Sequence, residues 1–480
     1  MNTTQRVVKN TFALLAGNLL ASGLGFVTAV YVARILGPGD FGRINFATAI
    51  VAYFMLLTNI GLPLLGIREI AGETLRIKEY LGQILTLRFV LAVLSFLLLA
   101  VLALFLPTHL EIKWLLLLYG IGVIPSALML DWLFQGVERM EYIGLAQIIA
   151  SLFTLTFTVI FIKGSHQLLA IPVMQVLGNC LAVLFLMAVC VRHYKPGPFI
   201  FCPRTWWPLL MKAFPIGFSL IMAQIFYNID SVMLGFMRTN EELGTYNAAY
   251  KVIFLCIIIV GAYHDATFPV LSNYFKTSRE SLKALVSFTE RLMVMIAIPL
   301  ALSVMVLAKP IMTLVYGVAY TEAAVPFRIL IWAVFILYIN TAYSRGVLAC
   351  KQTKWFLAGV TVPAIVNILS NCILIPPMGI AGAAIATVLA EASGFCIMYS
   401  GFQRITRVSI LPYVVKPLSA SAVMLVFLYG SAVFTQNLFV RICGSVVVYA
   451  AFLYLLKEIT RDDLDQVYRL IFASSKKDGV

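Results

Sequence analysis

Residues 12–36 read FALLAGNLLASGLGFVTAVYVARIL, an apolar run with a single charge, Arg34, near its end. A membrane-spanning helix needs about 20 apolar residues, because the hydrocarbon layer is about 30 Å thick. Arg6 and Lys9 precede the run, as in a secretion signal, but the apolar core of a signal has only about 7 to 15 residues. The run is therefore expected to stay in the protein as a membrane helix.

The composition of the whole chain is that of a membrane protein. The 480 residues are 61% hydrophobic and 12% charged, and the mean hydropathy is +0.96. A soluble domain is typically about 45–50% apolar and about 25% charged, and it cannot bury this much apolar surface behind so few charges. The bilayer is therefore the expected solvent.

Further apolar runs recur along the chain, separated by charges, Pro or Gly. The fourteen candidate spans are 12–36, 43–66, 84–106, 114–134, 145–162, 168–191, 213–235, 245–270, 288–308, 326–349, 357–375, 380–402, 413–434 and 438–456. The runs are continuous rather than alternating, which favours helices over the strands of a membrane barrel. We expect an all-α integral membrane protein with about fourteen transmembrane helices.

The basic residues are distributed unevenly between the two sides of these spans. With the N-terminus in the cytoplasm, 26 of the 35 Lys and Arg residues fall on the cytoplasmic side and 9 on the other. This asymmetry predicts that both termini are cytoplasmic. The net charge of +14 then belongs to loops beside an anionic leaflet, and nucleic acid is not an expected partner.

Signatures of catalysis are missing from the sequence. There is no P-loop, GxSxG or HExxH motif, the four histidines are scattered, and the eight cysteines form no CxxC pair. The outer connections are short, the longest being 309–325, which disfavours an enzyme whose site is built on an outer loop. We expect no catalytic residue, no metal site and no cofactor.

An internal repeat predicts two lobes. Residues 40–47, DFGRINFA, and 242–249, ELGTYNAA, share an acid, an apolar residue, Gly, Asn and Ala at an offset of 202. Six spans separate equivalent points, so the copies are parallel repeats, as in transporters. The expected units are an N-lobe over residues 1–205 with helices 1–6, a C-lobe over 206–405 with helices 7–12, and residues 406–480 with two extra helices and an amphipathic cytoplasmic tail.

Charged groups inside the spans are candidate functional residues. A charge near the bilayer centre costs about 2.5–3.5 kcal/mol on insertion scales, so it usually faces a cavity or a partner. Glu391 lies midway along the twelfth span. Asp230 and Lys251 lie at equal distances from the turn between spans seven and eight, so we expect their charged atoms within about 4 Å of each other, or bridged by one water or polar group. The competing interpretations are a structural ion pair for these two and an interhelical hydrogen bond for Glu391.

Amides inside the spans are a second set of candidates, because they can bind sugar hydroxyls but also join neighbouring helices. Gln224 and Asn228 form a polar stripe beside Asp230, whereas Asn18, Asn179 and Asn340 lie in other spans. Asp131, near the cytoplasmic end of the fourth span, is instead expected to reach the membrane interface.

Five motifs resemble those of the polysaccharide-biosynthesis branch of the multidrug/oligosaccharidyl-lipid/polysaccharide exporter superfamily. They are ARILGP at 33–38 with Phe41-Gly42, FQGVERM at 134–140, NIDSVMLG at 228–235, GTYNAAYK at 244–251 and GIAGAA at 379–384. The resemblance implies two six-helix lobes around a V-shaped cavity that opens alternately to each side. It also implies a flippase that carries an undecaprenyl-pyrophosphate-linked oligosaccharide outward across a bacterial or archaeal cytoplasmic (inner) membrane.

The resemblance further implies a proton or sodium gradient as the driving force, for which Asp230 or Glu391 would be the coupling group. The partners would be the lipid-linked oligosaccharide, membrane lipids, and a polysaccharide polymerase or other assembly proteins. The alternatives are a lipid II flippase or multidrug antiporter of the same superfamily, a membrane-embedded polysaccharide polymerase, and a non-transporting assembly partner.

The orientation can be tested by thiol labelling. Single cysteines at Gly39, Arg238 and Met378, in a chain without the eight native cysteines, should react with a membrane-impermeant reagent on cells whose outer barrier is permeabilised. Protection of all three positions would reverse the predicted topology.

Overall fold

The computed structural model describes residues 3–72, 77–194, 201, 203–435 and 437–458. Within these residues every regular element is a helix. The first part of the chain forms α1 (Thr3–Asn59), α2 (Leu62–Gly72), α3 (Ile77–Phe105), α4 (Leu110–Ile121), α5 (Val123–Leu128), α6 (Asp131–Gly136), α7 (Met140–Phe161), η2 (Ser165–Gln167) and α8 (Ala170–Tyr194). The rest forms α9 (Pro203–Met237), α10 (Asn240–Thr277), α11 (Arg279–Tyr316), η3 (Val318–Ala323), α12 (Ala324–Ala349), α13 (Thr353–Met378), α14 (Ile380–Gln403), η4 (Leu411–Tyr413), α15 (Val415–Phe434) and α16 (Leu438–Leu455).

The all-α membrane architecture expected from the sequence is confirmed, but the count of fourteen spans is not. Twelve helices of the described residues are long and apolar enough to cross a membrane. The first covers Leu14–Ala71, 58 residues, which is far more than the about 20 residues of one crossing. It is kinked at Gly37, where φ is 77°, a value that favours glycine, so the first two predicted spans are joined in one bent element. The expected eighth span, within α10, is not among the twelve.

The fourth predicted span, 114–134, is broken into α4, α5 and α6. A break inside a membrane frees backbone carbonyl groups, which need donors because no water is available there. Arg88 of α3, which is 3% exposed, supplies them: its guanidinium donates to the carbonyl oxygens of Ser126 at 2.8 Å and Met129 at 3.0 Å. A third bond, to Asn59 Oδ1 at 2.8 Å, links the same side chain to the end of α1.

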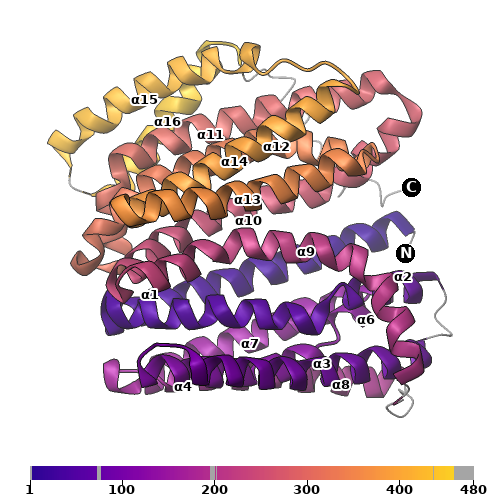
Figure 1. The fold of residues 1–480 in the computed structure, drawn as a ribbon. Helices are drawn as coiled ribbons and strands as arrows, with labels where there is room; N and C mark the ends of the chain where they lie inside the picture. The colour runs from indigo at the N-terminus through magenta and orange to yellow at the C-terminus, as the bar shows by residue number, and fades with distance from the viewer. Residues whose placement is uncertain (1–2, 73–76, 195–200, 202, 436, 459–480) are drawn as a thin grey trace.

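The helices form two halves, with α1 and α3–α8 in one and α9–α14 in the other (Figure 1). This arrangement agrees with the two lobes proposed from the repeat, although the boundaries at residues 205 and 405 stay predictions. We call the end of the bundle with Gly37, Thr239 and Gly379 the outer end, after the orientation predicted from the basic residues. The amphipathic helix expected at residues 464–471 lies outside the described residues.

Helices α15 and α16 pack on α11 at the edge of the second half (Figure 1). The hydroxyl of Tyr449 donates to the carbonyl oxygen of Met295 at 2.7 Å. Glu458 accepts from Arg291 of α11 at 2.9 Å and from Lys416 of α15 at 3.0 Å. The two extra helices are therefore fixed to the second half and stand away from the interface between the halves.

The two halves meet at the outer end through a pair of glycines that are equivalent in the repeat. A Cβ atom at Gly42 would lie 1.8 Å from the carbonyl oxygen of Asn240, and one at Gly244 would lie 1.9 Å from the carbonyl oxygen of Pro38. Real Cβ atoms do not approach other atoms this closely, and the obstructing atoms are backbone rather than movable side chains. Glycine at both positions therefore lets the two backbones touch and closes the outer end.

Replacing Gly42 by Val should weaken this closure. Overpacking costs about 1–3 kcal/mol, so the open form should gain about fivefold or more in population. The readout is a cysteine at Thr48, below the contact, in a cysteine-free chain: it should react faster with an impermeant thiol reagent added from the outer side. Gly39→Val is the matched control, because a Cβ at Gly39 meets nothing within 4 Å. Equal labelling in the two variants would show that the glycine contact is not the closure.

Candidate functional site

A polar cavity lies between the two halves and consists of three chambers. The C-side chamber, about 420 Å³, lies between α1, α9 and α10, and its polar walls include Ser22, Asn45, Asn228, Asn247 and Lys251. The outer chamber, about 370 Å³, lies among α1, α4, α7, α8 and α10, with Asn45, Gln175, Asn179 and Lys251 in its walls. The inner chamber, about 490 Å³, is lined among others by Asn18, Ser22, Asp131, Gln147 and Asn179.

The chambers share wall residues and so lie next to one another. Lys251 lines the C-side and outer chambers, Asn179 lines the outer and inner chambers, and Ser22 lines the inner and C-side chambers. A cavity of this kind, with amides and hydroxyls among apolar side chains, suits a ligand that is both polar and bulky.

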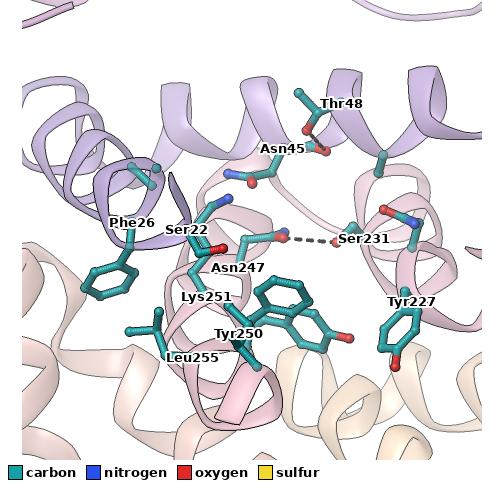
Figure 2. A pocket seen from close by; sticks show the side chains of 16 residues that line it. Ser22, Phe26, Asn45, Thr48, Tyr227, Ser231, Asn247, Tyr250, Lys251 and Leu255 are labelled. Atoms are coloured by element: carbon teal, nitrogen blue, oxygen red, sulfur yellow. Dashed lines mark hydrogen bonds between the residues drawn. The ribbon is translucent and has the colours of Figure 1, made fainter. Parts of the chain in front are cut away.

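Lys251 is the one basic side chain among the residues that line the three chambers. Figure 2 shows it beside Asn247 and Tyr250 of α10, opposite Asn45 of α1. Within the described residues it forms no hydrogen bond and no ion pair, and its ammonium group lies 5.9 Å from the centre of the Phe41 ring. Its charge is therefore available to an anionic ligand in the cavity.

The expected pairing of Asp230 with Lys251 is wrong. Asp230 is 3% exposed and accepts from three neutral side chains: Tyr246 at 2.7 Å, Asn371 at 2.6 Å and Thr387 at 2.6 Å. Tyr246 and Lys251 are five residues apart on α10, which places them about 140° apart around the helix. A helix that turns Tyr246 toward Asp230 therefore turns Lys251 away. Equal depth in the membrane did not fix the direction of the side chain.

The surroundings of Asp230 form an oxygen-rich cluster between α9, α10, α13 and α14. Asn371 also donates to Asn367 Oδ1 at 3.2 Å, and both of these amides are 0% exposed. Asn371 Oδ1 has no partner among the described residues. A carboxylate beside hydroxyl and amide oxygens can hold a proton or a hard cation such as Na⁺. In the part of the chain that the structure describes, no three His, Cys, Asp or Glu side chains lie close enough together to hold a metal ion.

Glu391 lies behind two tyrosines of the cavity wall. It lines a small pocket of about 20 Å³ together with Tyr227, Tyr250 and Thr387. The two tyrosines also line the C-side chamber, so their rings separate Glu391 from the main cavity. Thr387 in turn donates to Asp230 at 2.6 Å, so this side chain both lines the pocket of Glu391 and contacts Asp230.

The amides predicted as site residues fall into two groups. Asn18, Asn179 and Asn228 line chambers, whereas Gln224 and Asn340 line none of those described. The Asn228 amide donates to the carbonyl oxygen of Gln224 at 3.1 Å. The functional roles of all these residues stay predictions.

Sequence reasoning missed two asparagines that face the cavity, although the repeat contained the signal. Asn45 donates to the carbonyl oxygen of Phe41 at 2.6 Å, and Asn247 donates to that of Leu243 at 3.0 Å. Both pairs are four residues apart and related by the offset of 202. Asn247 also accepts from Ser231 at 3.1 Å (Figure 2). Asp131 lines the inner chamber at the start of α6, and its expected reach to the membrane interface stays a prediction.

The family model for "polysaccharide biosynthesis protein" matches residues 7–275, which is more than half of the chain. The chain belongs to this polysaccharide biosynthesis family. The matched part carries most of the cavity, because it contains α1, α7, α8 and α10.

Relatives of this chain are named as a transporter and a flippase. It is 21% identical, over 78% of its length and 91% of theirs, to a putative O-antigen transporter of Escherichia coli strain K12. It is 25% identical to a probable low-salt glycan biosynthesis flippase of Haloferax volcanii, over 35% of this chain and 36% of that protein.

Solved structures of two transporter types share the fold. The lipid II flippase MurJ in an inward closed conformation superimposes with a TM-score of 0.78 and 16% identity, over 92% of this chain and 97% of that chain. An inward-facing multidrug resistance transporter of the MATE family gives a TM-score of 0.66 and 14% identity, over 82% and 98%. At these identities the likeness shows the fold alone.

The bonds around Asp230 predict a difference between two asparagines. Asn371→Leu removes a donor from a buried carboxylate and should destabilise the protein by about 1–3 kcal/mol. Asn340→Leu should be close to neutral, because Asn340 forms no hydrogen bond within the described residues and its Oδ1 is buried without a partner. Thermal unfolding in detergent measures both. Equal melting temperatures for the two variants would contradict the Asp230 cluster.

Proposed function

We propose that this protein is a flippase that moves a polyprenyl-pyrophosphate-linked oligosaccharide across the cytoplasmic membrane for surface polysaccharide synthesis. The observation that carries the proposal is the polar cavity between the halves, in which Lys251 is unpaired among the described residues. The family and its named exporters support it.

The chemistry of the cavity suits such a headgroup. Pyrophosphate and sugars cannot enter hydrocarbon unaided, since each unpaired polar group there costs several kcal/mol. In the cavity, Lys251 would attract the pyrophosphate, and the amides of Asn18, Asn45, Asn179 and Asn247 would bind sugar hydroxyls. The lipid tail would remain in the bilayer.

Transport would occur by alternating access of the two halves. The Gly42–Gly244 contact closes the outer end, so the described conformation would receive its substrate from the inner side. Separation of these glycines and closure at the inner end would then release it outward. Asp230 and Glu391 are the groups we propose to respond to the driving ion, because they are carboxylates without ion-pair partners among the described residues, close to the cavity wall.

The alternatives differ in the ligand that the cavity would have to bind. A multidrug antiporter of organic cations would be opposed by the unpaired charge of Lys251. A lipid II flippase would carry the same pyrophosphate linkage and differ only in its sugar and peptide groups, and the fold of MurJ keeps this alternative open. A polymerase is less well supported, because the named relatives are exporters.

Neutralising the buried carboxylates should uncouple transport from the ion gradient. Glu391→Gln and Asp230→Asn keep the shape of the side chain and remove the titratable charge. When either variant is expressed in a deletion strain, we expect at least one of them to give roughly tenfold less surface glycan, which corresponds to a coupling free energy of about 1.4 kcal/mol. Lipid-linked repeat units should accumulate, and export should respond more weakly to ionophores.

Glu241→Gln is the control for this experiment, because Glu241 lies exposed in the first turn of α10 and the variant should export normally. Full export with both cavity variants would show that neither carboxylate couples transport. Normal surface glycan in the deletion strain itself would count against the flippase.

A further inference from the structure

The inner chamber contains a negative pole that the proposed binding of pyrophosphate does not use. Asp131 is the one acidic side chain among the residues that line the three chambers, as Lys251 is the one basic side chain. Its Oδ1 atom and the Oε1 atom of Gln147 are buried and have no hydrogen-bond partner in the described part of the chain. Asp131 and Gln147 both line this chamber, although these two oxygen atoms are themselves covered from it in the described conformation.

The position of Asp131 is built into the fold. It is the first residue of α6, directly after the break that follows α5. Arg88 holds this break through the carbonyl oxygens of Ser126 and Met129, and Met129 itself lines the inner chamber. Arg88 lines none of the chambers and makes no ion pair with Asp131, although its charge acts on that carboxylate. The break thus fixes Asp131 at the wall of the inner chamber.

A carboxylate and an amide at a chamber wall can accept hydrogen bonds, so they favour a ligand that donates them. Sugar hydroxyls and acetamido N–H groups are such donors, whereas the carboxylate of an acidic sugar is not and would be repelled by Asp131. Asn18, Ser151 and Asn179 in the same chamber can each donate or accept, so they do not discriminate by charge.

We propose that Asp131 and Gln147 form a sugar subsite that selects a neutral, hydroxyl- or acetamido-bearing sugar and rejects an acidic one. The proposal rests on the flippase function and adds the class of glycan. Ile258, which lines the inner chamber, follows Lys251 by seven residues on α10, which is about 10 Å along the helix toward the inner end. A headgroup with its pyrophosphate at Lys251 would extend its sugars in this direction.

The test uses two synthetic probes that differ in one charge. Both carry a disaccharide on a short polyprenyl pyrophosphate: N-acetylglucosamine–galactose in the neutral probe and N-acetylglucosamine–glucuronic acid in the acidic probe. Their affinities for the full-length protein in lipid nanodiscs are compared. We expect the wild type to bind the neutral probe about tenfold or more tightly than the acidic one, because like charges repel at this site.

Three variants separate the contributions. Asp131→Asn should remove the preference mainly by strengthening binding of the acidic probe, whereas Gln147→Leu should weaken binding of the neutral probe. Lys251→Gln should weaken both probes by the same factor. Glu141→Gln is the matched control: it removes an acid from the first turn of the same helix as Gln147, does not line the chambers, and should keep the wild-type preference. Thermal unfolding of each variant checks that it folds.

The outcomes distinguish the subsite from the function. If both probes bind, depend on Lys251 and show the same ratio in the wild type and Asp131→Asn, the sugar subsite is wrong and the flippase proposal stands. If neither probe binds any folded variant or the wild type, the proposed function itself fails, and the subsite with it.

Discussion

The contact between Gly42 and Gly244 is the constraint on which the cavity depends. Each glycine belongs to the same eight-residue motif in its copy of the repeat, and each lets a backbone of the other half approach to a distance that no side chain would allow. Three residues further along, the same motif places Asn45 and Asn247 in the wall of the C-side chamber. One short motif, used twice, therefore closes the outer end and supplies polar walls directly below the closure.

Asp230 and Lys251, two charged groups between the helices, have different surroundings, and this difference bears on their roles. Asp230 is surrounded by neutral donors from three other helices, so its charge is satisfied inside the protein. Lys251 has no such shell within the described residues and faces open volume. Lys251 is therefore open to an anionic ligand in the cavity, whereas Asp230 is bonded within the protein.

The sequence was sufficient for the fold class and the family, because apolar runs and a repeat with fixed spacing can be recognised without any knowledge of packing. It was insufficient for side-chain direction: Asp230 and Lys251 were expected to pair because they are equally far from the turn, yet this distance does not determine the angle around a helix. Nor could it locate the break before Asp131, because the donor that stabilises the break, Arg88, lies 41 residues from Met129 in the sequence. Asn45 and Asn247 were within reach, since the repeat aligned them.

The placement of the two poles has a consequence for alternating access. Asp131 and Gln147 belong to the first half of the molecule, and Lys251 belongs to the second. A ligand that contacts both poles would therefore connect the two halves, and its binding free energy would depend on how the halves are arranged. Only a differential affinity of this kind can shift a conformational equilibrium. A headgroup too short to reach from Lys251 to Asp131 would bind to one half alone and would leave the arrangement of the halves unchanged. The contacts that select the glycan would therefore be the same contacts that drive the transport step.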